Sequence, residues 1–288
     1  PVTVDFGGLG YTPSSTTIPV TFSASPTGDT AIGVANSDIN GVITSITVTH
    51  PGSGYVTAPT TTIDEPTSDV FSTDVQKIDV TASSSLNILE ANAIELVNLT
   101  TAGNPITLQA GGITQSGALI ASSLTVTNTA GSVVLDQNND VATVTIANPV
   151  GDVTYNTNRA TATDIAGIQG VNVDLDSENG FTQSGAITAT SLDVTNTVAG
   201  NVVLDQNNDV GTVTITNTVG DVTYTTISSS ITDINGIQGV NIVLNTDNGV
   251  SQSAAITATN SLTVTNAVSG NVVLDQNNNV ATVAISNA

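Results

Sequence analysis

The chain has no cysteine, methionine or tryptophan, and aromatic residues make up only 3% of its 288 positions. Without cysteine no disulfide framework exists. Lys77 and Arg159 are the only lysine and arginine beside 24 acidic residues, which gives a formal charge of −22 with histidine neutral. A nucleic-acid partner is therefore excluded, because phosphates need cations to neutralise them. No run of 18 apolar residues occurs, so we do not expect the chain to be embedded in a membrane.

What the chain does contain is typical of β structure. Hydrophobic residues reach 39% while charged residues stay at 9%, and the apolar content is mainly Val, Ile, Leu and Ala. A disordered chain would show low hydrophobicity and high charge. β-Branched side chains favour pleated, half-buried surfaces, and Thr, Ser, Asn and Gly fill much of the remainder. The composition predicts an all-β protein.

A long internal repeat occupies the second part of the chain. "VVLDQNNDV" occurs at 133–141 and 202–210 and returns as "VVLDQNNNV" at 272–280, so the copies lie 69 and 70 residues apart. Within this unit, short alternating strands start every 20 to 27 residues. Such a period predicts a right-handed parallel β-solenoid, a β-helix with repeats of about 69 residues and three coils each. Nine to ten coils at about 4.8 Å each would give a rod about 45 Å long.

The predicted domains are a small β domain at 1–64, a linker or solenoid cap at 65–84 and the solenoid at 85–288. In the small domain, Asn40-Gly41 between apolar strands is a hairpin signal. Tyr11 and Tyr55 follow glycine turns, over which we expect them to pack, with stacking on carbohydrate as the alternative.

The repeated "DQNND" has two interpretations. Carboxylate and amide oxygens suit calcium, which makes Asp136, Asp140, Asp205, Asp209 and Asp275 weak candidate ligands. However, Asn279 replaces the second Asp in the last copy, and no glycine forms a tight metal loop. A wide polar turn explains the motif better. We therefore predict no dedicated metal site, with calcium as the one possible cofactor.

The sequence contains few groups of side chains that could carry out catalysis. Elimination in polysaccharides needs a basic proton abstractor, and hydrolysis needs paired carboxylates. The candidates Lys77, Arg159 and His50 lie in three different segments, and Glu is rare in the repeats. We therefore predict a protein that is not an enzyme, with a β-helical polysaccharide lyase or hydrolase as an alternative that depends on Arg159.

The two ends of the sequence suggest a way of assembling. The first strand, 2–6, has no hairpin partner in its own sequence, and the last coil stops before the place where "GDVTY" would begin the next one. Either the chain is a fragment or neighbouring subunits supply the missing pieces. We expect a head-to-tail homopolymer formed by β-strand addition. Its predicted contact residues are Val2, Val4, Phe6, Val280, Val283 and Ile285.

The solenoid part resembles filamentous-haemagglutinin-type secreted adhesins. The resemblance lies in "GGITQSGALIASSLTVTNTAGSVVLDQNNDVATVTI" at 111–146 and its later copies. It implies an extracellular β-helix on the cell surface or in a matrix, although the family's secretion domain is not in this sequence. Residues 1–64 resemble G-x-G-Y β repeats of bacterial surface and phage structural proteins. We expect a structural subunit of an extracellular filament. A monomeric adhesin or phage fibre segment that binds surface glycans is the alternative.

Overall fold

The computed structural model describes residues 11, 15–38, 42–63, 68–73, 75–228 and 230–288. The chain divides into two compact units, residues 1–73 with 82–89, and residues 74–81 with 90–288. The described residues form two sheets and no helix, as the sequence predicted for an all-β protein. The predicted contact residues Val2, Val4 and Phe6 lie outside the described residues.

The smaller sheet is antiparallel. It comprises β1 (Ile18–Phe22), β2 (Ile32–Ser37), β3 (Ile43–His50) and β4 (Thr61–Ile63), in the spatial order β3-β2-β1-β4. β2 and β3 pair antiparallel, as the hairpin signal predicted, while the turn at 39–41 lies outside the described residues. The core of this sheet includes Val20 and Phe22, and Tyr11 and Tyr55 pack against it. The Tyr55 hydroxyl donates to Ser23 O at 2.9 Å, which ties the ring to the chain.

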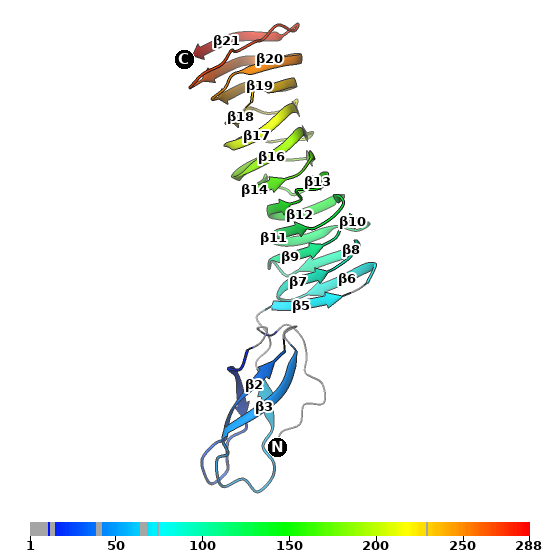
Figure 1. Cartoon of the computed structure of the whole chain (residues 1–288), viewed down its shortest axis with the longest axis vertical. Helices are drawn as coiled ribbons and strands as arrows, with labels where there is room; N and C mark the ends of the chain where they lie inside the picture. Colours follow the sequence, from blue (N-terminus) through cyan, green and yellow to red (C-terminus); the bar gives the residue numbers. More distant parts are fainter. Residues whose placement is uncertain (1–10, 12–14, 39–41, 64–67, 74, 229) are drawn as a thin grey trace. The chain divides into compact units, whose positions relative to one another are not determined.

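The larger sheet is a parallel β-solenoid of 17 strands (Figure 1). Strands β5 and β6 fall within residues 65–84, the segment predicted as linker or cap. The strands are β5 (Ser68–Thr73), β6 (Lys77–Ala82), β7 (Ser85–Glu90), β8 (Ile94–Thr101), β9 (Ile106–Ala110), β10 (Ile113–Gln115), β11 (Leu119–Asn128), β12 (Val133–Ala147), β13 (Val153–Thr157), β14 (Thr163–Gln169), β15 (Asn172–Ser177), β16 (Phe181–Asn196), β17 (Val202–Asn217), β18 (Val222–Thr226), β19 (Thr232–Thr246), β20 (Val250–Asn266) and β21 (Asn279–Asn287).

The solenoid core follows directly from the alternation of side chains along each strand. In β9, Ile106, Leu108 and Ala110 are fully buried while the residues between them are exposed. The same alternation recurs in later strands, so aliphatic side chains stack inside the coils and Thr, Asn and Asp face outwards. Turn glycines allow the coils to close tightly. A Cβ on Gly200, whose φ is 86°, would lie 2.2 Å from Asn179 O.

The strand registers set the length of a coil. Val133 pairs with Val153, which pairs with Val173, then Leu192, then Val213, so four coils take 80 residues and one takes about 20. A 69-residue repeat therefore spans about three and a half coils rather than the three expected. The difference arises because strands stack in more than one column, a column being a set of strands that pair from one coil to the next. Val133 pairs with Val153 whereas Val144 pairs with Ile165, so Val133 and Val144 lie in different columns.

Because each repeat is half a coil longer than three whole coils, successive copies of the repeat lie on alternate sides of the solenoid. Val202, which opens the second copy of "VVLDQNNDV", pairs with Phe181 and Val222. It lies midway along the chain between Leu192 and Val213, which are one coil apart and belong to the column of Val133. The second copy is thus half a coil away from the first. Val272, in the third copy, pairs with Val250, close to the first column again.

Candidate functional site

The "DQNND" motif bends a strand at a corner of the solenoid. In β12 the register shifts between Leu135 and Asn139, and β17 shows the same shift between Leu204 and Asn208. Val133 and Leu135 point inwards and Asp136 is exposed. The sequence predicts a wide polar turn here, whereas β12 runs through the whole motif, so these residues form a polar bend within a continuous strand.

One asparagine of the motif turns into the core and organises the corner. Asn139 is fully buried, and its Oδ1 accepts from Gln115 Nε2 at 2.5 Å and from Leu119 N at 2.8 Å. Its Nδ2 donates to Leu135 O at 3.1 Å and to Asn156 O at 2.9 Å. One side chain therefore connects three successive coils. The pairs Gln183–Asn208 and Gln252–Asn278 repeat the arrangement. Local sequence preferences do not predict this pairing, although both residues recur together in all three copies.

The candidate calcium ligands lie on the outer side of these corners. Asp136, Asp205 and Asp275 each accept a hydrogen bond from the side chain of the next residue, a glutamine. Asp140 forms an ion pair with Arg159, and Asp209 lines a lateral groove with Pro149 and Val171. Over the described part of the chain, no three acidic or histidine side chains gather closely enough to hold a metal ion.

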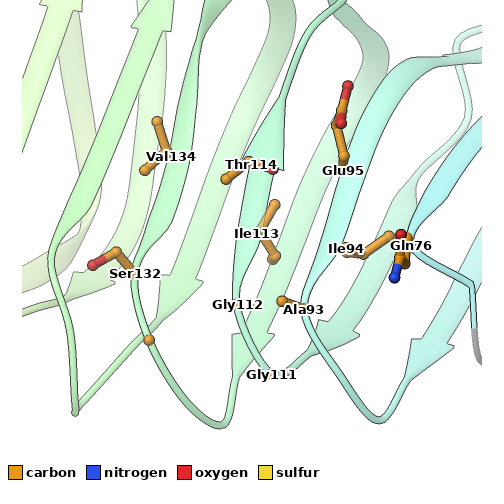
Figure 2. A pocket seen from close by; sticks show the side chains of 11 residues that line it. Gln76, Ala93, Ile94, Glu95, Gly111, Gly112, Ile113, Thr114, Ser132 and Val134 are labelled. Carbon is orange, nitrogen blue, oxygen red and sulfur yellow. The ribbon is translucent and has the colours of Figure 1, made fainter.

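A second lateral groove lies at the corner beside Gly111, across the coils that contain β8, β10 and the start of β12 (Figure 2). Its volume is about 440 Å³. Glu95, at its rim, forms an ion pair with Lys77 at 2.8 Å and accepts from Ser116 Oγ at 2.7 Å. The hydrogen bonds from Lys77 and Ser116 lower the pKa of Glu95, so this carboxyl stays ionised.

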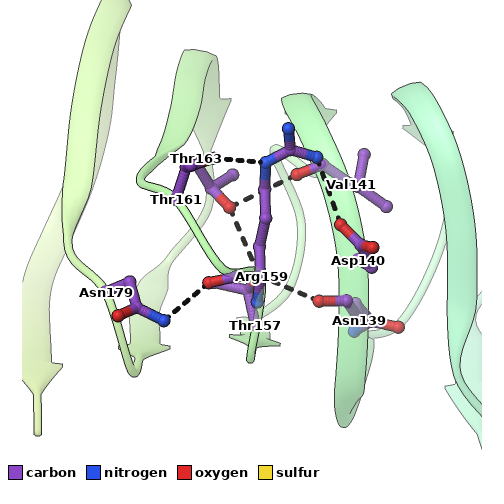
Figure 3. Close-up of polar contacts among 8 residues, drawn as sticks. All are labelled: Asn139, Asp140, Val141, Thr157, Arg159, Thr161, Thr163 and Asn179. Atoms are coloured by element: carbon purple, nitrogen blue, oxygen red, sulfur yellow. Dashed lines mark hydrogen bonds and ion pairs between the residues drawn. The ribbon is translucent and has the colours of Figure 1, made fainter. Parts of the chain in front are cut away.

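Arg159 links neighbouring coils through its side chain and its backbone (Figure 3). Its Nη1 lies 3.1 Å from Asp140 Oδ1, and its Nε donates to Thr161 Oγ1 at 3.0 Å. Its carbonyl accepts from Asn179 Nδ2 at 2.7 Å. Ser228 takes the equivalent place in the next copy, where its carbonyl accepts from Asn248 in the same way. The backbone contact is thus present in both copies, whereas the ion pair depends on Arg159, whose place in the next copy is taken by Ser228.

Three carboxylates on one outer face lie near enough to repel one another. The registers place Asp174 beside Asp193, and Asp176 follows two residues after Asp174 on the same face. Partial burial, together with repulsion from Asp176 and Asp193, raises the pKa of Asp174. The pKa of Asp193 is raised by partial burial and by Asp176. Ionisation of these carboxyls therefore lowers the stability of the folded state.

Two tyrosines are enclosed in the solenoid interior. Tyr155 and Tyr224 are 0% and 1% exposed and occupy equivalent positions in the first and second copies. Burial raises the pKa of both phenols above the ordinary value, so both stay protonated in neutral solution. Each serves as core packing.

The coil that contains β21 exposes side chains whose counterparts are buried elsewhere. β21 pairs in parallel with β20, which places Val283 beside Leu262 and Ile285 beside Val264. Leu262 and Val264 are 1% and 0% exposed, whereas Val283 and Ile285 are each 52% exposed. Val280 is half-buried. The three C-terminal residues predicted as subunit contacts therefore lie together on one coil.

Comparison of the chain with protein-family models, with curated proteins and with solved structures found no match. Among the residues that the structure describes, no helix has the length and apolar character needed to cross a membrane.

Proposed function

We propose that the protein is a structural subunit of an extracellular filament in which subunits stack head to tail. The observation that carries the proposal is the exposure of Val283 and Ile285 on β21, in columns that are otherwise buried. A strand added to this coil would repeat the parallel pairing that joins every earlier coil. Covering two half-exposed aliphatic side chains contributes about 1 kcal/mol each, before backbone hydrogen bonds are counted.

The incoming strand in this proposal is the N-terminal segment of the next subunit. Its sequence alternates apolar residues at Val2, Val4 and Phe6, the spacing that a strand needs to face a core on one side. The scarcity of residues that oxidise or that trypsin cleaves supports an extracellular role, because a long-lived fibre outside the cell gains from chemical inertness.

The test is electron microscopy and sedimentation of the purified 288-residue chain and three variants. Deleting residues 1–7, or replacing Val283 and Ile285 together by Lys, should abolish filaments while the far-ultraviolet circular dichroism of the solenoid is retained. The matched control replaces Val198 and Val268 by Lys, since these turn residues are 61% and 65% exposed. Filaments that persist in both test variants, or a wild-type chain that stays monomeric at high concentration, would overturn the proposal.

A further inference from the structure

We infer that Asn235 is a site of spontaneous deamidation, a modification that does not depend on filament assembly. The reaction is favoured where glycine follows asparagine, because glycine has no side chain to hinder attack by its backbone nitrogen on the asparagine side chain. Asn235 precedes Gly236 in β19, and its side chain is exposed. Within the described part of the chain Asn179 and Asn248 also precede a glycine, while Asn40 lies outside it.

The peptide bond between Asn235 and Gly236 lies at a β-bulge. Ile234 and Ile237 are three residues apart, whereas their partners in β17 are two residues apart. The extra residue of a bulge is left out of the regular hydrogen-bond ladder. Gly236 has a φ of 103°, and a Cβ placed on it would lie 3.7 Å from its nearest neighbour beyond the adjoining residues. The backbone here is therefore less confined than that of a regular strand.

The three asparagine side chains differ in how firmly they are held. Those of Asn179 and Asn248 each donate to a backbone carbonyl of the preceding coil, at 2.7 and 2.5 Å. In the second pair the glycine N–H also donates to a side-chain oxygen, at 3.1 Å, which occupies the nitrogen that would attack. By contrast, Asn235 Nδ2 makes a longer contact of 3.3 Å with Thr214 Oγ1 on the exposed face. Rotation of Asn235 towards Gly236 therefore breaks the weakest contact of the three.

The reaction needs water and no other reactant. The Gly236 nitrogen loses its proton to solvent hydroxide and bonds to Asn235 Cγ, which closes a succinimide ring. The side-chain nitrogen takes up a proton from water and leaves as ammonia. Water then adds to either ring carbonyl and breaks its bond to nitrogen, which gives aspartate or isoaspartate at position 235. In total one water molecule is consumed and one ammonia molecule is released.

The product places a second carboxylate beside Asp233. Ser253 Oγ donates to Asp233 Oδ2 at 2.6 Å and to Asn235 Oδ1 at 3.3 Å, so the two side chains share one hydroxyl. The amide of Asn235 is neutral, whereas a carboxylate in its place would repel that of Asp233. Each modified chain therefore gains negative charge at a fixed point of the solenoid.

The experiment is peptide mapping by mass spectrometry of the full chain after increasing times in mildly alkaline buffer. Asn235 should be converted about fivefold faster than Asn179 or Asn248, because each of those must first release a short hydrogen bond. The product should contain both aspartate and isoaspartate. Conversion should accelerate as the pH rises, because hydroxide removes the amide proton.

The matched control is Asn235→Ala. Ala166 has the equivalent place in the preceding copy, before Gly167 with a φ of 127°, so the bulge accepts alanine. This variant should release ammonia more slowly than wild type. In denaturant, Asn179, Asn235 and Asn248 should be converted at similar rates, because the selectivity comes from the fold.

The inference is overturned if Asn235 stays intact in the folded chain while the denatured chain is converted. It is equally overturned if Asn179 or Asn248 is converted as fast as Asn235 in the folded chain, or if the preference for Asn235 persists unchanged in denaturant.

Discussion

At the scale of single residues, the buried asparagine of each corner contributes more to holding the corner together than the aspartates beside it do. Asn208 is fully buried and contacts Gln183, Ile187, Leu204 and Thr225 through hydrogen bonds. An amide suits this position because it can donate and accept at once, which a carboxylate cannot do. The third copy keeps this residue as Asn278 although it loses the following Asp.

Replacing Asn208 by Ala should lower the free energy of unfolding by about 3 kcal/mol, because the buried Ile187 N–H and two carbonyls would lose their partner. Chemical denaturation followed by circular dichroism measures the change. The adjacent Asn207 is exposed and serves as the control, for which Asn207→Ala should stay within about 0.5 kcal/mol of wild type. Equal effects of the two substitutions would contradict the role of Asn208.

The sequence indicated the polar corner but not which of its residues turns inwards. Turn composition in "DQNND" predicts a bend from local preferences alone. The inward orientation of Asn139 depends on Gln115, which lies 24 residues earlier in the chain and meets it because the coils stack. A contact of this kind is set by register, and register follows from the packing of whole coils rather than from local sequence.

At the scale of strands, parallel stacking places like charges together as readily as like apolar residues. Asp174 in β15 and Asp193 in β16 pair directly. The other copies carry Thr125 and Thr263 where the second copy has Asp193. The repulsion on this face is therefore a local feature of the second copy, and the fold does not require it.

Asp193→Thr should raise the melting temperature at neutral pH. The pKa of Asp193 is raised in the folded state. The stability that this carboxyl contributes is therefore present below its unfolded-state pKa and is lost as the pH rises through its folded-state pKa. The advantage of Thr should therefore be largest at neutral pH and shrink as the pH falls to about 3, where the carboxyl is protonated.

Thermal melts of both proteins at acid and neutral pH measure this difference. Asp205→Thr, at an exposed carboxylate outside the cluster, is the control and should show no comparable pH-dependent gain. A gain for Asp193→Thr that is the same at both pH values would show that the effect is one of β propensity alone.

Strand periodicity predicted the solenoid but miscounted the coils within a repeat. Alternating Val, Ile and Leu residues mark each inward face, which is why the all-β solenoid and its approximate number of coils were predictable. The pattern does not say which face a strand occupies, because all faces bury the same kinds of side chain. Strand spacing alone therefore predicts three coils per repeat, although pairings such as that of Val144 with Ile165 give about three and a half.

At the scale of the whole solenoid, a repeat of three and a half coils displays each repeated feature on alternate sides. A feature present in all copies, such as the exposed Asp of "DQNND", faces one side at Asp136 and Asp275 and the other at Asp205. A repeat of whole coils would instead align every copy along one side. For a filament, this arrangement distributes the acidic corners over both sides of the rod, which limits a one-sided build-up of charge.

Distances between spin labels on these three aspartates test this arrangement. Because the chain contains no cysteine, single Asp→Cys substitutions provide unique attachment sites. At about 4.8 Å per coil, Asp136 and Asp275 should lie about 34 Å apart along the axis, and Asp205 should lie about 17 Å along the axis from either. Since Asp205 is on the other side, its measured distance from Asp136 should also include the width of the solenoid. It should therefore clearly exceed half the distance from Asp136 to Asp275, whereas a distance close to half would place all three copies on one side and contradict the half-coil offset.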